Sequence, residues 1–140
     1  MRAVIHALGI ALGLSAMAAA ACGYCVEDKI AAVYDHDVVT RALGRKHYVA
    51  FFAINGTLTP GDGARRAIEV IVESARGVDK GSAKLSTDSA SLALAFDPQR
   101  TSLSAVQKAI EQKLVNKNLS LQPLRIIEQH GQMKVIDENR

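Results

Sequence analysis

Residues 47–55 read His-Tyr-Val-Ala-Phe-Phe-Ala-Ile-Asn, and the fold can be inferred outward from this segment. Its aromatic and β-branched residues predict a β-strand. A loop containing Pro60 follows over residues 56–63, and residues 64–76 then carry apolar side chains at helical spacing. The segment therefore begins a unit of strand, loop and helix.

Two further strands are predicted over residues 82–86 and 91–96. The second alternates large apolar residues with small ones, and the polar residues 87–89 supply a turn between the two strands. Asp97 and Pro98 end the pattern. This part of the chain therefore predicts a hairpin.

A second helix and a last strand complete the domain. Thr101 or Ser102 can cap a helix that runs to about residue 115, and residues 119–127 form a strand in which Pro123 predicts an edge or a bulge. The order over His47–Ile127 is β-α-β-β-α-β. It predicts an α+β fold, a ferredoxin-like sandwich with two helices on one face of a four-stranded antiparallel sheet.

The sequence on either side of this domain falls into separate segments. Apolar residues recur at three- and four-residue steps between residues 25 and 43, which predicts an extra, separate helix within an amino-terminal segment of residues 22–46. Residues 128–140 are polar and are expected to form a loose tail, in which Met133 and its apolar neighbours pack locally at most.

Residues 1–21 have the order of a secretory signal peptide. Arg2 gives a positive charge, an apolar run follows, and small residues lead up to Ala21. We expect cleavage near Ala21 or Cys22 and a periplasmic or secreted protein, which meets the membrane only through its signal peptide. One alternative is an uncleaved anchor, although the run barely reaches the roughly 20 residues of a span. The other is a lipoprotein acylated at Cys22, although the bulky aliphatic residue of a lipobox is missing.

Four short motifs resemble those of one family. They are Ala-Ile-Glu at residues 67–69, Ala-Arg-Gly-Val at 75–78, Leu-Ala-Leu-Ala-Phe-Asp-Pro at 92–98 and Val-Gln-Lys-Ala-Ile-Glu at 106–111. Together they resemble the heavy-metal-associated (HMA-like) domain, a family that includes copper chaperones, mercury-binding periplasmic proteins and the amino-terminal domains of metal-pumping ATPases. The resemblance covers roughly residues 47–127 and implies a ferredoxin-like protein that binds or traffics heavy metals.

The chain departs from that family in the metal loop. The family carries a CxxC in the loop before the first helix, with its second cysteine four residues before the Ile of the Ile-Glu pair. The corresponding positions here are Gly61 and Ala64. This loop has no soft ligand, so the resemblance assigns no metal ligand to it.

The two cysteines of the chain, Cys22 and Cys25, form a single CxxC at the expected mature amino terminus. Two thiolates at this spacing can hold one soft ion, and thiolates favour Cu(I) among physiological metals. A disulfide between them would close a ring too short to add much stability. We therefore predict a soft metal ion, most readily Cu(I), held by Cys22 and Cys25 and passed to a metal transporter or acceptor protein.

Two other functions remain open. An oxidised pair could sit on a metal-less ferredoxin-like module that acts only by binding another protein. Alternatively, Cys-Gly-Tyr-Cys has the form of a thiol–disulfide oxidoreductase motif, and a helix amino terminus lowers a thiol's pKa. Such a motif normally follows a strand, whereas only the signal peptide precedes Cys22.

The remaining polar residues have simpler structural interpretations. His36 lies between Asp35 and Asp37, but consecutive helical side chains diverge by about 100°, so a solvated face is expected. His130 with Met133 could supply accessory copper ligands, although a loose tail is the preferred interpretation.

The composition argues against several classes of protein. The chain has 17 basic and 14 acidic side chains, few aromatics and no dense basic patch, so nucleic acid is not expected as a partner. The 119 residues that remain after the signal suffice for one domain. No catalytic triad, metalloprotease helix or paired carboxylate motif is recognisable, so we do not expect an enzyme.

Overall fold

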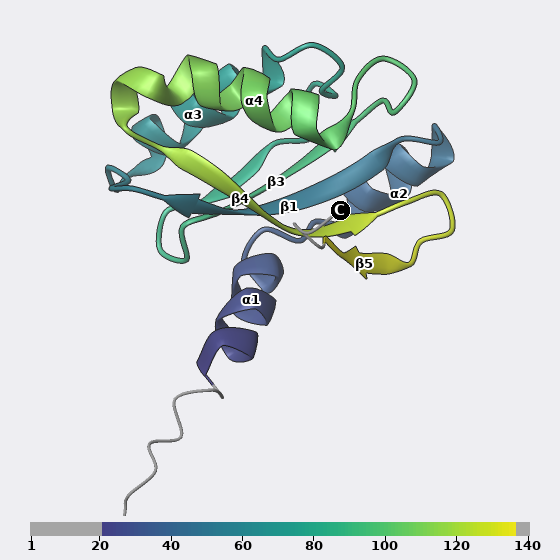
Figure 1. Cartoon of the computed structure of the whole chain (residues 1–140), viewed down its shortest axis with the longest axis horizontal. Helices are drawn as coiled ribbons and strands as arrows, with labels where there is room; N and C mark the ends of the chain where they lie inside the picture. Colours follow the sequence, from purple (N-terminus) through teal and green to yellow (C-terminus); the bar gives the residue numbers. More distant parts are fainter. Residues whose placement is uncertain (1–20, 137–140) are drawn as a thin grey trace, which may run out of the picture.

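A computed structural model describes residues 21–136, and for residues 21–25 it describes the backbone alone. The described chain forms five strands in one sheet, with helices on both of its faces (Figure 1). No described helix is both long and apolar enough to cross a membrane. The helices are α1 (Ala21–Ala31), α2 (His36–Gly44), α3 (Asp62–Glu73), α4 (Leu103–Leu114) and the 3-10 turn η1 (Val115–Lys117). The strands are β1 (Tyr48–Asn55), β2 (Lys84–Ser86), β3 (Ser91–Phe96), β4 (Ser120–Ile127) and β5 (Met133–Val135).

The strand order β2-β3-β1-β4-β5 confirms the ferredoxin-like topology. The neighbouring strands are all antiparallel. Helix α3 connects β1 to β2, which are separated by β3, and helix α4 connects β3 to β4, which are separated by β1. Both units are therefore split βαβ crossovers, as the pattern of residues 47–127 predicts.

The two Ala-Ile-Glu motifs have the same role in α3 and α4. Ile68 and Ile110 are buried in the core between the helices and the sheet. The glutamate that follows each of them accepts a backbone N–H from a strand: Glu69 from Leu85 at 3.0 Å and Glu111 from Leu121 at 2.7 Å. Each motif thus both packs its helix on the sheet and ties it to a strand.

The amino-terminal segment differs from the expected single, separate helix. It forms two helices, because the Asp35 carboxylate accepts the backbone N–H of Val38 at 3.0 Å and starts a new helix at this point. Both helices pack on the face of the sheet opposite α3 and α4, so the expectation that this segment stands apart from the domain is wrong. The second core contains the following buried side chains: Ile30, Val33, Val38, Val39, Ala42, Val49, Phe51, Ala53, Ala93, Ala95, Leu124 and Ile127.

The carboxyl-terminal part confirms one prediction and corrects another. The register of β1 with β4 shifts between Phe51, opposite Arg125, and Phe52, opposite Pro123, which is the predicted bulge. Residues 133–135, however, form β5 and pair with the end of β4, so the tail is not loose there. Its turn needs Gly131, whose φ is +69°.

The hairpin also begins later than predicted. Ser82 lies before β2 rather than within it. Its side-chain hydroxyl, instead of its backbone, makes the hydrogen bond to β3. The hydroxyl accepts the Ala95 N–H at 3.0 Å and donates to the Asp79 carbonyl at 2.7 Å. The pairing of β2 with β3 therefore starts only at Lys84.

Candidate functional site

The predicted metal ligands lie near the amino end of α1. Cys22 and Cys25 both fall within this helix, but their side chains lie outside the described part of the chain. The predicted signal peptide also falls outside it, apart from Ala21. The site on Cys22 and Cys25 therefore remains a prediction, and the structure contributes the placement of the helix that carries them.

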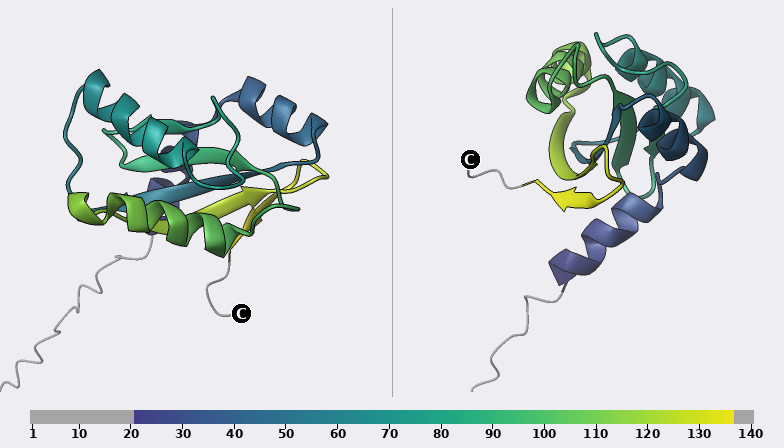
Figure 2. Two further views of the ribbon diagram at one scale, coloured as in Figure 1. Left: turned by 90° about the horizontal axis from the view of Figure 1, so that it is seen from above. Right: turned by 90° about the vertical axis from the view of Figure 1, so that its right-hand side faces the viewer.

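The carboxyl-terminal half of α1 is anchored to the sheet. Ile30 is buried in the second core. The Lys29 ammonium donates to the Ser89 carbonyl of the β2–β3 turn, and the Glu27 carboxylate lies 3.3 Å from the Arg125 guanidinium on β4. From this anchor the amino end of α1 leads away from the sheet (Figures 1 and 2). The CxxC segment therefore belongs to the projecting end of the helix.

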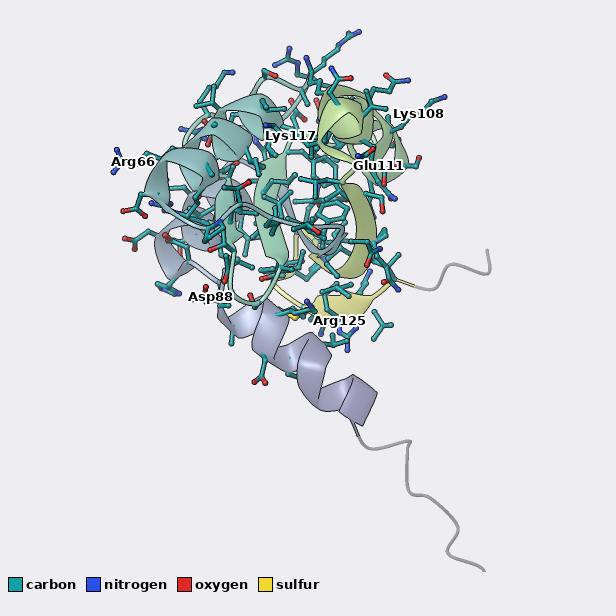
Figure 3. The ribbon with its side chains drawn as sticks, turned by 90° about the vertical axis from the view of Figure 1, so that its left-hand side faces the viewer. Arg66, Asp88, Lys108, Glu111, Lys117 and Arg125 are labelled. Carbon is teal, nitrogen blue, oxygen red and sulfur yellow. The ribbon has the colours of Figure 1, made fainter. Side chains whose placement is uncertain are left out.

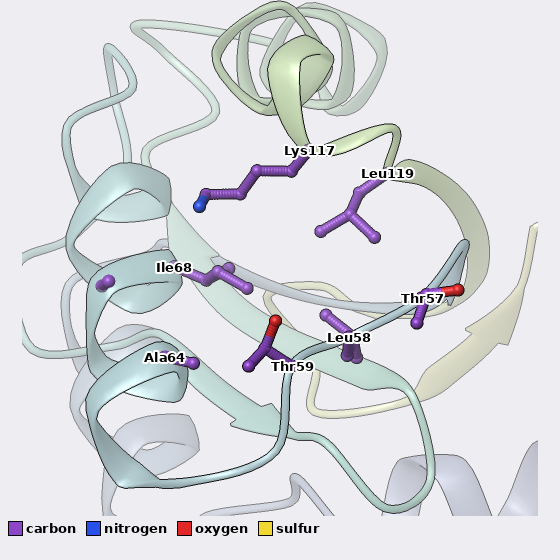
Figure 4. A pocket seen from close by; sticks show the side chains of 8 residues that line it. Thr57, Leu58, Thr59, Ala64, Ile68, Lys117 and Leu119 are labelled. Atoms are coloured by element: carbon purple, nitrogen blue, oxygen red, sulfur yellow. The ribbon is translucent and has the colours of Figure 1, made fainter.

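The loop between β1 and α3 borders a small pocket of about 190 Å³ (Figure 4). Figure 4 shows the Lys117 side chain extending from the turn before β4 toward α3. None of the lining residues carries a thiol, an imidazole or a carboxylate, so these residues do not suit a soft metal. They are Thr57, Leu58, Thr59, Ala64, Ala67, Ile68, Lys117 and Leu119.

A close backbone approach lies next in sequence to residues that line this pocket. Gly56 has a φ of +118°, and a Cβ atom at this position would lie 2.5 Å from the Asn118 carbonyl oxygen. Only glycine lets the loop after β1 come this near to the turn before β4. Lys117 and Leu119 flank Asn118, so this approach also brings their side chains beside the loop.

Asp35, His36 and Asp37 do not converge on a common point in the structure. Asp35 caps α2 and lies 3.3 Å from the Lys84 ammonium. The hydrogen bond from the Val38 N–H is the main cause that holds the pKa of the Asp35 carboxyl below its ordinary value, and Lys84 adds to it. His36 contacts Thr40 at 3.5 Å on the exposed surface of the helix. His36 and Asp37 are exposed, as predicted, whereas Asp35 is half-buried as the cap of α2.

A different cluster surrounds His47, directly before β1. Its Nδ1 lies 2.9 Å from both carboxylate oxygens of Asp79, and its Nε2 lies 3.8 Å from Oδ2 of Asp97. This cluster was not predicted from the sequence. The antiparallel pairing of the first and third strands could have placed His47 beside Asp97, but the position of Asp79 depends on the loop after α3.

Other charged residues have local partners or face solvent. Arg65 pairs with Glu69 at 3.0 Å and with Asp62 at 3.4 Å, and the negative charge of Glu69 is the main cause that raises its pKa. Arg66 and Lys108 project from the outer side of the helical layer (Figure 3). Among the described side chains, no three or more His, Cys, Asp or Glu residues are placed so that all of them could ligate one metal ion.

No protein-family model matches the sequence, and no curated protein matches it either. Several solved structures show partial similarity, among them the following three. Oxidized MerP from Ralstonia metallidurans CH34 has a TM-score of 0.43 at 13% identity, over 55% of this chain and 96% of its own. A copper binding domain from HMA7, a P-type ATPase, gives 0.45 at 17% identity, over 55% and 93%. The CopZ metallochaperone gives 0.41 at 18% identity, over 53% and 98%. These similarities are too distant to assign a family.

Proposed function

We propose that this chain is an exported, non-enzymatic protein that binds one soft metal ion through Cys22 and Cys25 and presents it to a protein acceptor. Cu(I) is the proposed ion, because thiolates select it and because it accepts as few as two sulfur ligands. The ion is cargo in this proposal. The acceptor would be a transporter or another thiol-bearing protein.

The observation that carries the proposal is the position of the CxxC segment on the projecting end of α1. Buried side chains and the Lys29 contact fix the other end of this helix to the sheet. Transfer of a thiolate-bound ion requires that the acceptor's ligands reach the metal. A helix end that leads away from the domain leaves room for such an approach (Figure 2).

The composition of the pocket beside the loop between β1 and α3 also supports Cys22 and Cys25 as the metal ligands. Its lining offers hydroxyls, apolar groups and the Lys117 ammonium, and a cation repels Cu(I). Met133 carries a thioether and is 40% exposed. Its replacement therefore tests whether a weaker sulfur ligand contributes to Cu(I) binding. The thiol pair is therefore the proposed binding site.

Titration of the reduced protein against a competing Cu(I) chelator tests this function. We expect about one Cu(I) per chain in the wild type and loss of that site when Cys22 and Cys25 are both replaced by Ser. Met133→Leu should leave the affinity unchanged. Equal affinity in the wild type and the double Ser variant would exclude the CxxC as the site.

The same titration addresses the alternative functions. Absence of Cu(I) binding in every variant would favour the metal-less interaction module. The oxidising compartment raises one further requirement, because a disulfide has no thiolate to offer. The proposal therefore includes a reducing partner or metal loading before the thiols oxidise.

A further inference from the structure

We propose that His47 and Asp97 form a second metal site, which takes a divalent ion of borderline softness such as Zn²⁺ and uses Asp79 to orient the imidazole. The site lies where β1 begins and β3 ends. It is separate from Cys22 and Cys25 and does not depend on the function proposed for them.

Backbone hydrogen bonds fix the three segments that carry these side chains. Strand β1 pairs with β3 so that the residue before β1 lies beside the residue after β3. The Asp79 N–H donates to the Ala95 carbonyl at 2.8 Å, and the Asp97 N–H donates to the Gly77 carbonyl at 2.9 Å. The loop after α3 is thus tied to the end of β3 from both sides. The His47 N–H also donates to the Ala42 carbonyl at 2.9 Å, so backbone hydrogen bonds position all three residues at this end of the sheet.

The contact with Asp79 sets the orientation of the imidazole. Nδ1 lies 2.9 Å from both oxygens of that carboxylate. Because an ionised carboxylate can only accept hydrogen bonds, Nδ1 carries a hydrogen and donates a hydrogen bond to Asp79. In the neutral ring the lone pair is then on Nε2. Metal-binding histidines commonly donate their other ring N–H to a carboxylate, which fixes the tautomer and makes the ring a stronger ligand.

Asp97 offers the second metal ligand, its carboxylate oxygen Oδ2. Its Oδ1 accepts the Gln99 N–H at 2.9 Å, while its Oδ2 lies 3.8 Å from Nε2 of His47. That distance is too long for a hydrogen bond. Zinc bonds to nitrogen and oxygen measure about 2.0–2.2 Å, so an ion between the two atoms can reach both.

The proposed site has two protein ligands, His47 and Asp97, and is open to solvent. The His47 and Asp97 side chains are 19% and 22% exposed, so water can supply the remaining ligands. One imidazole and one carboxylate suit Zn²⁺ rather than Cu(I), which prefers thiolates. The two carboxylates of Asp79 and Asp97 also make the surroundings of a neutral His47 negative, which favours a divalent cation.

Calorimetric titration with Zn²⁺ tests the proposal, using the chain in which Cys22 and Cys25 are both replaced by Ser so that thiols cannot contribute. We expect one Zn²⁺ per chain and a shift of the His47 imidazole signals in NMR spectra. Asp97→Asn should weaken binding at least about tenfold, and Asp79→Asn about 10- to 100-fold.

Controls separate this site from general binding to histidines. His36→Gln and His130→Gln remove two exposed imidazoles elsewhere and should leave the affinity unchanged. Asp97→Asn keeps the Oδ1 acceptor for Gln99, and thermal melting checks that it folds. If Asp97→Asn does not fold, His47→Gln removes the other ligand and tests the same site. No Zn²⁺ binding, or equal binding by the parent and a folded variant at His47 or Asp97, would overturn the proposal.

Discussion

At the scale of single residues, Glu111 links a helix to the backbone of a strand. Its Oε1 accepts the Leu121 N–H at 2.7 Å, and Gln107 on the same helix donates to the Leu121 carbonyl at 2.9 Å. Glu111→Ala would leave that N–H without its acceptor, at a cost of about 1–3 kcal/mol in the free energy of unfolding. Glu111→Gln keeps an acceptor oxygen and should cost less. Urea denaturation measures both, and equal losses in the two variants would contradict this role.

At the scale of elements, Asp35 determines where α2 begins. Replacing it with Ala should cost about 0.5–2 kcal/mol, because the cap is lost, whereas Asn retains the cap. The folded state lowers the pKa of Asp35, so the carboxylate stabilises the fold above its ordinary pKa of about 3.9 and loses this effect as the pH falls below it. Denaturation between pH 6 and pH 2 should therefore show a shallower fall in stability for Asp35→Asn than for the wild type. Identical pH profiles would show that Asp35 has no such role.

At the scale of the whole molecule, the order and type of the elements over residues 47–127 could be predicted because periodicity and turn residues are local signals. The second helical layer could not be assigned in this way, although residues 48–54 are apolar at positions that face both sides of the sheet. A strand that is apolar on both faces indicates burial on both faces. Phe51 and Phe52, each no more than 1% exposed, lie in different cores. The His47 cluster escaped prediction because its partner Asp79 is 32 positions away.

The central claim is that an exported chain carries a soft metal on its amino-terminal cysteines. Native mass spectrometry of the protein, purified without oxygen from its own compartment, tests this claim most directly. We predict a chain that begins between Ala18 and Cys22, with reduced cysteines and one copper ion. A chain with Met1 intact, or a metal-free chain with a Cys22–Cys25 disulfide, would contradict it.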